Sequence, residues 1–179
     1  TPFANVFVNP HYEENLYPRD FIYSLAESKG YFGARVMFGT DSNDDGIDVI
    51  RTILDDEKPN FLGAGAPAQT QSLETSIRWF LIAATVRRLR NSGKQPYTTM
   101  LINASERIQY HFDLWFVARD IVIQIRERIK TDPTIKLELE GLWRKETELL
   151  PASEFKSLHF AFEKIFSEIL ATIELLGPI

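Results

Sequence analysis

The chain has no cysteine among its 179 residues, which excludes disulfide bonds and cysteine-ligated zinc sites. It also has no uninterrupted apolar run near the roughly 18 residues that a membrane-spanning helix needs. A secretory signal would place basic residues ahead of an apolar core and a small-residue cleavage site, and the opening TPFANVFVNPHYEEN has neither. We therefore expect a cytoplasmic protein without a membrane partner.

Positive charge is also scarce. The 20 Lys and Arg residues are outnumbered by 25 Asp and Glu residues, which gives a formal net charge of −5 and a pI near 5.3. A dedicated nucleic-acid-binding domain usually carries a basic face, so this balance argues against one, local patches excepted. The 3 histidines lie far apart in the sequence and lack the paired spacing typical of metal ligands.

Apolar residues are plentiful, at 44% of the chain with 13 Phe, and this composition is typical of a packed core. The length suits one compact domain. Residues 1–66 hold six of the nine glycines, and we expect a strand- and loop-rich segment there. Its short β-branched and aromatic runs predict strands at 5–8, 20–25 and 48–54.

The second segment, residues 67–179, has apolar residues at helical spacing. These predict helices over about 72–91, 106–130, 134–149 and 153–176. Ser72 is the expected N-cap of the first helix. The run YTTMLINAS predicts one central strand at about 97–103. The expected fold class is α/β and helix-dominated, with a few short strands packed against four long helices in one compact unit.

Nucleotide-binding motifs are incomplete. A phosphate-binding loop needs an early glycine and ends in Gly-Lys-Ser/Thr, whereas Gly93-Lys94 is followed by Gln95. The acids at 55–57 follow an apolar run, as Mg²⁺-binding acids do, but charge runs are usually solvated. We interpret 55–57 as a solvated turn.

Metal-binding patterns are equally partial. The loop 41–52 has the first half of an EF-hand pattern, but Thr52 stands where the bidentate Glu is required. A metal-dependent nuclease site needs acids that hold Mg²⁺ and a nearby lysine. The nearest match is Asp20 with Glu27 and Lys29, but the spacing between them is short for such a site. We therefore expect no metal site in this chain.

The densest basic cluster comprises Arg87, Arg88, Arg90 and Lys94. One interpretation is that these charges complement the C-terminal end of the helix dipole. The other is that they contact nucleic-acid phosphates. Both remain open from the sequence.

Five segments, taken in order, resemble the successive blocks of the Z-one (Z1) domain family of bacterial proteins. They are TPFANVFV, LYPRDFIYSL, GYFGARVMFG, SLETSIRWFLIAATVRRLR and TMLINAS, and they span residues 1 to about 105. Family members are labelled as endonucleases with a helicase-like ATPase core. The resemblance implies a part of a RecA-like, helicase-type core that acts in restriction or phage defence.

The same resemblance implies roles for individual residues. Thr1 and Pro2 resemble the second half of helicase motif III, which couples ATP hydrolysis to nucleic-acid binding, so we expect the chain to be an internal slice of a larger polypeptide. Candidate residues of the cleft between its lobes are Arg19, Asp20, Asn103 and Ser105. For Arg19 and Asp20 a purely structural role is an equal alternative. No cofactor is expected in this chain, whereas ATP and Mg²⁺ are expected in the parent protein.

Three functions remain open at this point. The first is a non-autonomous segment of a helicase-like, nucleic-acid-directed ATPase or endonuclease, with the other domains of the polypeptide, and DNA, as partners. The second is a non-catalytic helical module that binds another protein. The third is a stand-alone metal-dependent nuclease domain.

Overall fold

The computed structural model describes residues 33–39, 46–47, 49–61, 66–92, 97–153 and 156–176. The chain divides into two compact units, Thr1–Gly46 and Ile47–Ile179. The strands expected at 5–8 and 20–25 lie outside the described residues, and so does half of the EF-hand-like loop.

In the first unit the described element is the short helix α1 (Ala34–Phe38). Gly39 ends it with φ of 75°, and Gly46 has φ of 66°, a backbone region that glycine enters at little cost. A Cβ atom at position 46 would collide with the backbone of residues 37–39. Gly46 is therefore required for this close approach.

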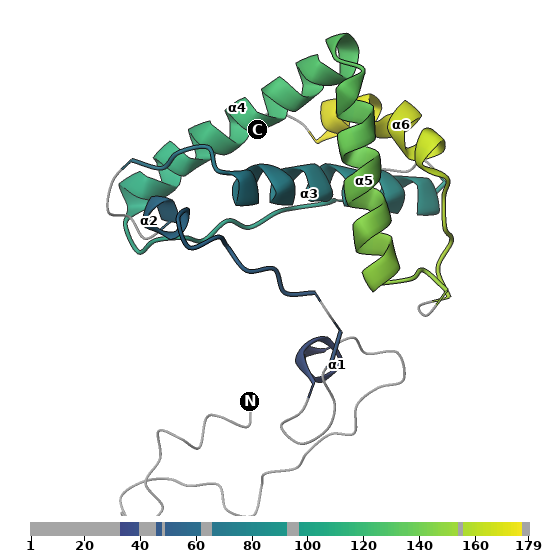
Figure 1. Cartoon of the computed structure of the whole chain (residues 1–179), viewed down its shortest axis with the longest axis horizontal. Coiled ribbons are helices and arrows are strands. Elements are labelled where there is room, and N and C mark those ends of the chain that lie inside the picture. Colours follow the sequence, from purple (N-terminus) through teal and green to yellow (C-terminus); the bar gives the residue numbers. More distant parts are fainter. Residues whose placement is uncertain are drawn as a thin grey trace, which may run out of the picture. The chain divides into compact units, whose positions relative to one another are not determined.

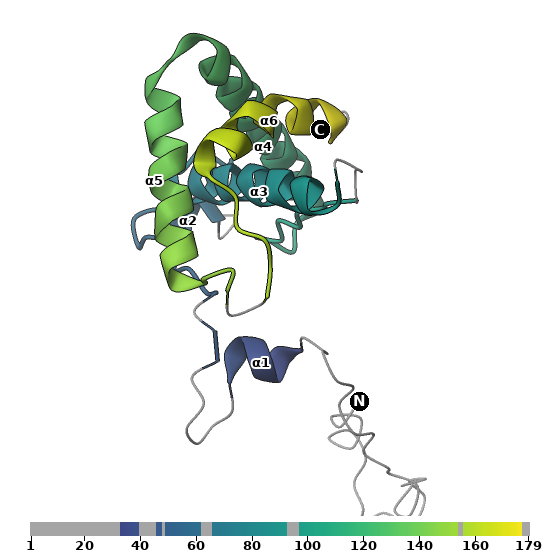
Figure 2. The same ribbon diagram turned by 90° about the vertical axis from the view of Figure 1, so that its right-hand side faces the viewer.

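The second unit is a bundle built around one central helix. Its elements are α2 (Lys58–Phe61), α3 (Gln71–Arg90), α4 (Ile108–Thr131), α5 (Thr134–Leu149) and α6 (Phe162–Leu175). Helix α3 contacts α4, α5 and α6, and α5 runs steeply across it (Figures 1 and 2). The most enclosed apolar side chains come from all four long helices: Leu81, Ile82, Ile121, Ile125, Ile135, Leu139, Ile165 and Ile169.

Helix α3 is buried around most of its circumference because its apolar residues do not keep to one face, as the sequence predicts. Its first turn differs from the expectation. The N-cap is Thr70, whose Oγ1 accepts a hydrogen bond from the Leu73 amide at 3.2 Å. The expected N-cap, Ser72, lies inside the helix, so that assignment is wrong.

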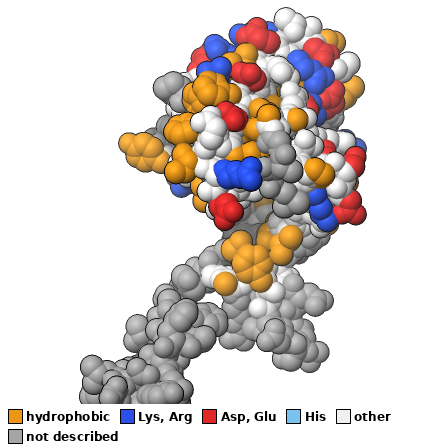
Figure 3. Space-filling view, turned by 90° about the vertical axis from the view of Figure 1, so that its left-hand side faces the viewer, with side chains coloured by type: hydrophobic (Ala, Val, Ile, Leu, Met, Phe, Trp, Pro, Cys, Tyr) orange, Lys and Arg blue, Asp and Glu red, His pale blue; other side chains and the backbone are white. Residues whose placement is uncertain are grey.

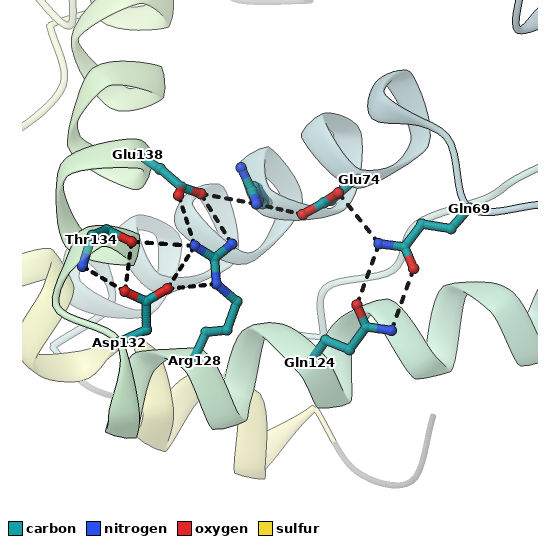
Figure 4. A network of polar contacts seen from close by, with 8 residues as sticks. Gln69, Glu74, Gln124, Arg128, Asp132, Thr134 and Glu138 are labelled. Carbon is teal, nitrogen blue, oxygen red and sulfur yellow. Dashed lines mark hydrogen bonds and ion pairs between the residues drawn. The ribbon is translucent and has the colours of Figure 1, made fainter.

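A network of charged side chains fixes the corner between α4 and α5 (Figure 4). The Arg128 guanidinium donates to Asp132 at 2.8 Å and to Glu138 at 2.7 Å. Glu138 also forms an ion pair with Arg78 of α3, at an N–O distance of 3.0 Å. Hydrogen bonds from Thr134, and then from Arg128, lower the pKa of Asp132 to about 2. The network therefore joins three helices at one end of the bundle.

The expected α/β fold is wrong, because the described residues contain helices and no strand. The described residues of 48–54, and those of 97–103, have no regular secondary structure. A strand needs a neighbour to satisfy its backbone groups, and no second strand lies beside either segment in the described part. Residues 49–54 are instead tied to α5 by an ion pair between Arg51 and Glu146 at 2.6 Å.

Helix boundaries agree with the sequence in some places and differ in others. Helix α5 has exactly the predicted residues, and α4 differs from its prediction by two residues at its start and one at its end. The helix expected over 153–176 begins at Phe162, and the described residues before it are not helical. The apolar spacing continues through Leu158, but that side chain is 65% exposed, so no burial favours a helix there.

Candidate functional site

The basic cluster at the end of α3 separates into one buried and two exposed arginines. Arg88 is buried, forms an ion pair with Glu168 of α6, and donates from Nε to Thr172 Oγ1 at 3.2 Å. Hydrogen bonding from Arg88, and secondarily from Lys164, lowers the pKa of the Glu168 carboxyl. Arg88 therefore serves the contact between α3 and α6, and its guanidinium presents almost no surface to a phosphate.

Arg87 and Arg90 lie on the surface. Arg87 Nη1 donates to the carbonyl oxygen of Tyr97 at 2.7 Å, and Arg90 Nε donates to the carbonyl oxygen of Leu158 at 3.1 Å. Tyr97 is 95% exposed. An exposed arginine is thus bound to the backbone of an exposed tyrosine, and we call Arg87, Arg90 and Tyr97 the α3 end site.

Tyr97 did not emerge from the sequence as a site residue. The available signal is its position a few residues after a basic helix terminus, where a glycine-containing connection can bring the chain back. Exposed aromatic rings near cations are a recurring feature of single-stranded nucleic-acid binding. The sequence alone does not reveal that the ring faces solvent.

The remaining predicted residues are not gathered at the α3 end site. Asn103 is exposed, and Ser105 organises the start of α4: its Oγ accepts from the Arg107 amide at 3.2 Å, and its carbonyl accepts from His111. Among the described residues, no hydrogen bond or ion pair joins Asn103 or Ser105 to Arg87 or Arg90. The other predicted site residues lie outside the described residues: Thr1, Pro2, Arg19, Asp20 and Lys94.

The acidic run at 55–57 has a structural role at its last residue. Glu57 is buried, and its carboxylate accepts hydrogen bonds from the amides of Gln71 at 2.7 Å and Ser72 at 3.1 Å. The Ser72 hydroxyl, followed by these amides, lowers the pKa of Glu57. The interpretation of 55–57 as a solvated turn is therefore wrong for Glu57, which stabilises the positive end of α3.

Metal ligation finds no support in the described residues, where no group of three or more His, Cys, Asp or Glu side chains could hold an ion. The charged networks that do exist pair each carboxylate with an arginine or a helix amide, as for Glu138, Glu168 and Glu57. Carboxylates engaged in this way stabilise helix packing.

A second accessible surface lies on α4, on the side opposite its buried face. We call it the α4 stripe; its members recur at helical spacing and are Ile108, Phe112, Trp115, Phe116, Arg119 and Ile123. Ile108 is 75% exposed and Phe112 is 59% exposed. In Figure 3, which views the molecule from the side where α4 begins in Figure 1, hydrophobic side chains gather on the surface.

Arg119 lies over two rings of the α4 stripe, 5.3 Å from the centroid of Trp115 and 5.2 Å from that of Phe116. Beside Trp115 an open groove of about 510 Å³ runs between α3, α4 and residues 98–102. Ile108, Phe112 and Trp115 fall at the helical spacing that predicts α4, but the structure leaves all three exposed. The buried face of this part of α4 is formed by Tyr110 and Leu114 instead.

None of the helices in the described part is both long and apolar enough to cross a membrane. No curated protein and no solved structure matches the chain. The sequence model of the Z1 domain matches residues 72–177, more than half of the chain. This match contains the last two of the five blocks that resemble the family, and it extends through α4, α5 and α6, which the resemblance left unassigned. The chain belongs to the Z1 domain family.

Proposed function

We propose that the helical unit is a non-catalytic, nucleic-acid-contacting module of a cytoplasmic, nucleic-acid-directed ATPase or endonuclease of the Z1 type. The observation that carries this proposal is the α3 end site, where the exposed Arg87 binds the backbone carbonyl of Tyr97, a residue that is itself exposed. Single-stranded nucleic acids bind to such pairs because a base stacks on the ring while a cation contacts the adjoining phosphate.

The charge distribution favours a local contact over an extended one. The net charge of −5 opposes general attraction to a polyanion. Of the three described arginines in the last turn of α3, one is neutralised by Glu168. The remaining two suit a short stretch of phosphates, so we expect weak and strongly salt-dependent binding.

ATP and Mg²⁺ belong to the parent protein in this proposal. The described residues do not fit a Mg²⁺–nucleotide site, since they provide no acidic cluster for a cation. The sequence also lacks a complete phosphate-binding loop. We assign nucleotide hydrolysis, and any strand cleavage, to other domains of that polypeptide.

Fluorescence anisotropy of a labelled oligothymidylate tests the proposal on the 179-residue chain. Tyr97→Ala should weaken binding roughly tenfold or more, because base stacking on an aromatic side chain is worth about 1–3 kcal/mol. Tyr97→Phe should bind almost normally, since it keeps the ring. Arg87→Gln should weaken binding and reduce the slope of log affinity against log salt by about 0.7, the value for one single-strand phosphate contact.

The matched control for Arg87→Gln is Arg144→Gln, which removes another exposed arginine, this one from α5, where its side chain is 69% exposed. It should leave the affinity and the salt slope unchanged. Equal loss in both arginine variants would show that only net charge matters. Unchanged binding by Tyr97→Ala would contradict a stacking role and would refute the α3 end site.

A further inference from the structure

The second unit has a cleft between α3 and α5, and residues 49–54 contribute its third wall. We call it the α3–α5 cleft. Its volume of about 620 Å³ lies within the range of about 300–1,000 Å³ that is typical of small-molecule sites. On α3 the lining side chains recur at helical spacing: Ser72, Thr75, Ser76, Trp79 and Ala83. No residue of the α3 end site or of the α4 stripe lines this cleft, so it is a separate candidate site.

One wall of the α3–α5 cleft is an indole ring that a second indole supports. Trp79 of α3 is half-buried and packs on the buried Trp143 of α5, with ring centroids 6.2 Å apart and an angle of 29° between the ring planes. Phe80 and Leu142 extend the apolar lining. Because Trp143 fixes one side of the Trp79 ring, a planar ligand can stack on Trp79 at little cost in side-chain entropy.

The charged side chains of the α3–α5 cleft favour a negatively charged ligand. Three ionisable residues line the cleft: Arg51, Lys145 and Glu146. Arg51 and Glu146 form an ion pair at an N–O distance of 2.6 Å, so their charges compensate each other. Lys145 forms no ion pair or hydrogen bond in the described part of the chain. The lining therefore carries one uncompensated positive charge, which attracts an anion.

We propose that the α3–α5 cleft binds a small aromatic carboxylate. The aromatic ring of the ligand stacks on Trp79, and its carboxylate pairs with the ammonium group of Lys145. The hydroxyl of Thr75, which has no hydrogen-bond partner among the described residues, provides a second donor. A single uncompensated cation matches a monoanion better than a phosphate monoester, whose charge at neutral pH is about −1.5 to −2.

Nuclear magnetic resonance of the indole N–H groups tests this site on the 179-residue chain. Its 3 tryptophans give one proton–nitrogen correlation each, and Trp79→Phe identifies the signal of Trp79. The probe is naphthoate, which combines a planar ring system with one carboxylate. We expect naphthoate to shift the Trp79 signal to a plateau and to leave the signal of Trp115, on α4, in place.

Two related compounds separate the ring from the charge. Naphthylmethanol keeps the ring system without the charge, and cyclohexanecarboxylate keeps the charge without a planar ring. Both should bind more weakly than naphthoate, because each lacks one of the two contacts, with Lys145 or with Trp79. Equal affinity of naphthoate and naphthylmethanol would show that the cleft does not select an anion and would overturn the proposal.

Three substitutions on α5 test the charge directly. Lys145→Gln should weaken naphthoate binding roughly two- to fivefold, the range expected for a solvated ion pair. The matched control is Arg144→Gln, which removes the same charge from the neighbouring residue, whose side chain does not line the cleft, and it should bind normally. Glu146→Gln should bind more tightly than the unmodified chain, because it removes the negative charge of the lining. The Trp143 signal verifies that each variant remains folded.

A Trp79 signal that naphthoate does not shift, or equal weakening by Lys145→Gln and Arg144→Gln, would overturn the proposal. A shift of Trp115 in place of Trp79 would also reject the α3–α5 cleft, because it would locate the probe beside α4. The outcome is independent of nucleic-acid binding. Tyr97→Ala leaves every residue of the cleft in place and should bind naphthoate with unchanged affinity.

Discussion

Replacing Arg88 by methionine tests whether Arg88 serves helix packing, in contrast to Arg87 in the same helix turn, for which we propose a contact with nucleic acid. Methionine keeps much of the aliphatic bulk but removes the ion pair with Glu168 and the hydrogen bond to Thr172. The expected result is a large loss of stability with little direct effect on nucleic-acid contact. Arg87→Met is the neighbouring control, since Arg87 is exposed and donates only to one backbone carbonyl in the described contacts.

The magnitude follows from the surroundings of the pair. Removing one partner of a fully buried ion pair costs about 3–5 kcal/mol. The side chain of Glu168 is 30% exposed and lies 3.4 Å from Lys164, so its carboxylate keeps some solvation and a second cation. We therefore expect about 2–3 kcal/mol for Arg88→Met. For a unit of this size that corresponds to a fall in Tm of roughly 10 °C. Arg87→Met should cost less than about 0.5 kcal/mol.

Urea and thermal unfolding followed by far-ultraviolet circular dichroism measure both variants. Adding Glu168→Gln to Arg88→Met should recover part of the lost stability, because the orphaned carboxylate is the main source of the cost. If Arg88→Met unfolds at the same urea concentration as Arg87→Met, the buried pair contributes nothing and the assignment of Arg88 to helix packing is refuted. Loss of oligonucleotide binding by a fully folded Arg88→Met would refute it as well.

Two further predictions concern helix ends. The pKa of Asp132 in the folded state is about 2, below its ordinary value of 3.8. The ionised carboxylate therefore contributes to stability above pH 3.8, and this contribution is lost as the pH falls towards 2. Asp132→Asn should flatten the low-pH part of a plot of urea midpoint against pH, and an unchanged low-pH part would contradict the lowered pKa. Thr70→Ala removes the N-cap of α3 and should cost about 1 kcal/mol in urea unfolding, whereas Ser76→Ala, inside the same helix, should change stability by less than about 0.5 kcal/mol. Equal effects would reject Thr70 as the cap.

Helices could be predicted from this sequence where local signals and burial agree. Helix α5 follows Pro133, which disfavours helix at the preceding residue and suits a helix start, and it buries Ile135, Leu139 and Trp143 at helical spacing. Because start signal and apolar period coincide, the predicted and observed bounds of α5 are identical. Before α6 the apolar period continues at Leu158, but that side chain is exposed, and the helix begins only at Phe162.

The sequence predicts a strand at 97–103 that the structure does not contain, and it does not predict the role of Arg88, because each depends on a distant partner. β-Branched and aromatic residues favour extended backbone, but a strand forms only beside another strand. Arg87 and Arg88 are alike in sequence, and the difference between them is Glu168, which lies eighty residues further along the chain. The sequence predicts a solvated Glu57 for the same reason. The amides that donate hydrogen bonds to its carboxylate belong to Gln71 and Ser72, fourteen and fifteen residues away.

Helix α4 shows that apolar spacing predicts a helix but not which of its apolar residues are buried. Ile108, Phe112, Trp115 and Ile125 all fall at the helical spacing that predicts α4, yet the first three are exposed and Ile125 is buried. The spacing does not say whether an apolar face is covered by the same chain, because a core and an interface impose the same period on a helix. The period alone therefore does not distinguish the exposed α4 stripe from the buried face that Tyr110, Leu114, Ile121 and Ile125 form on the same helix.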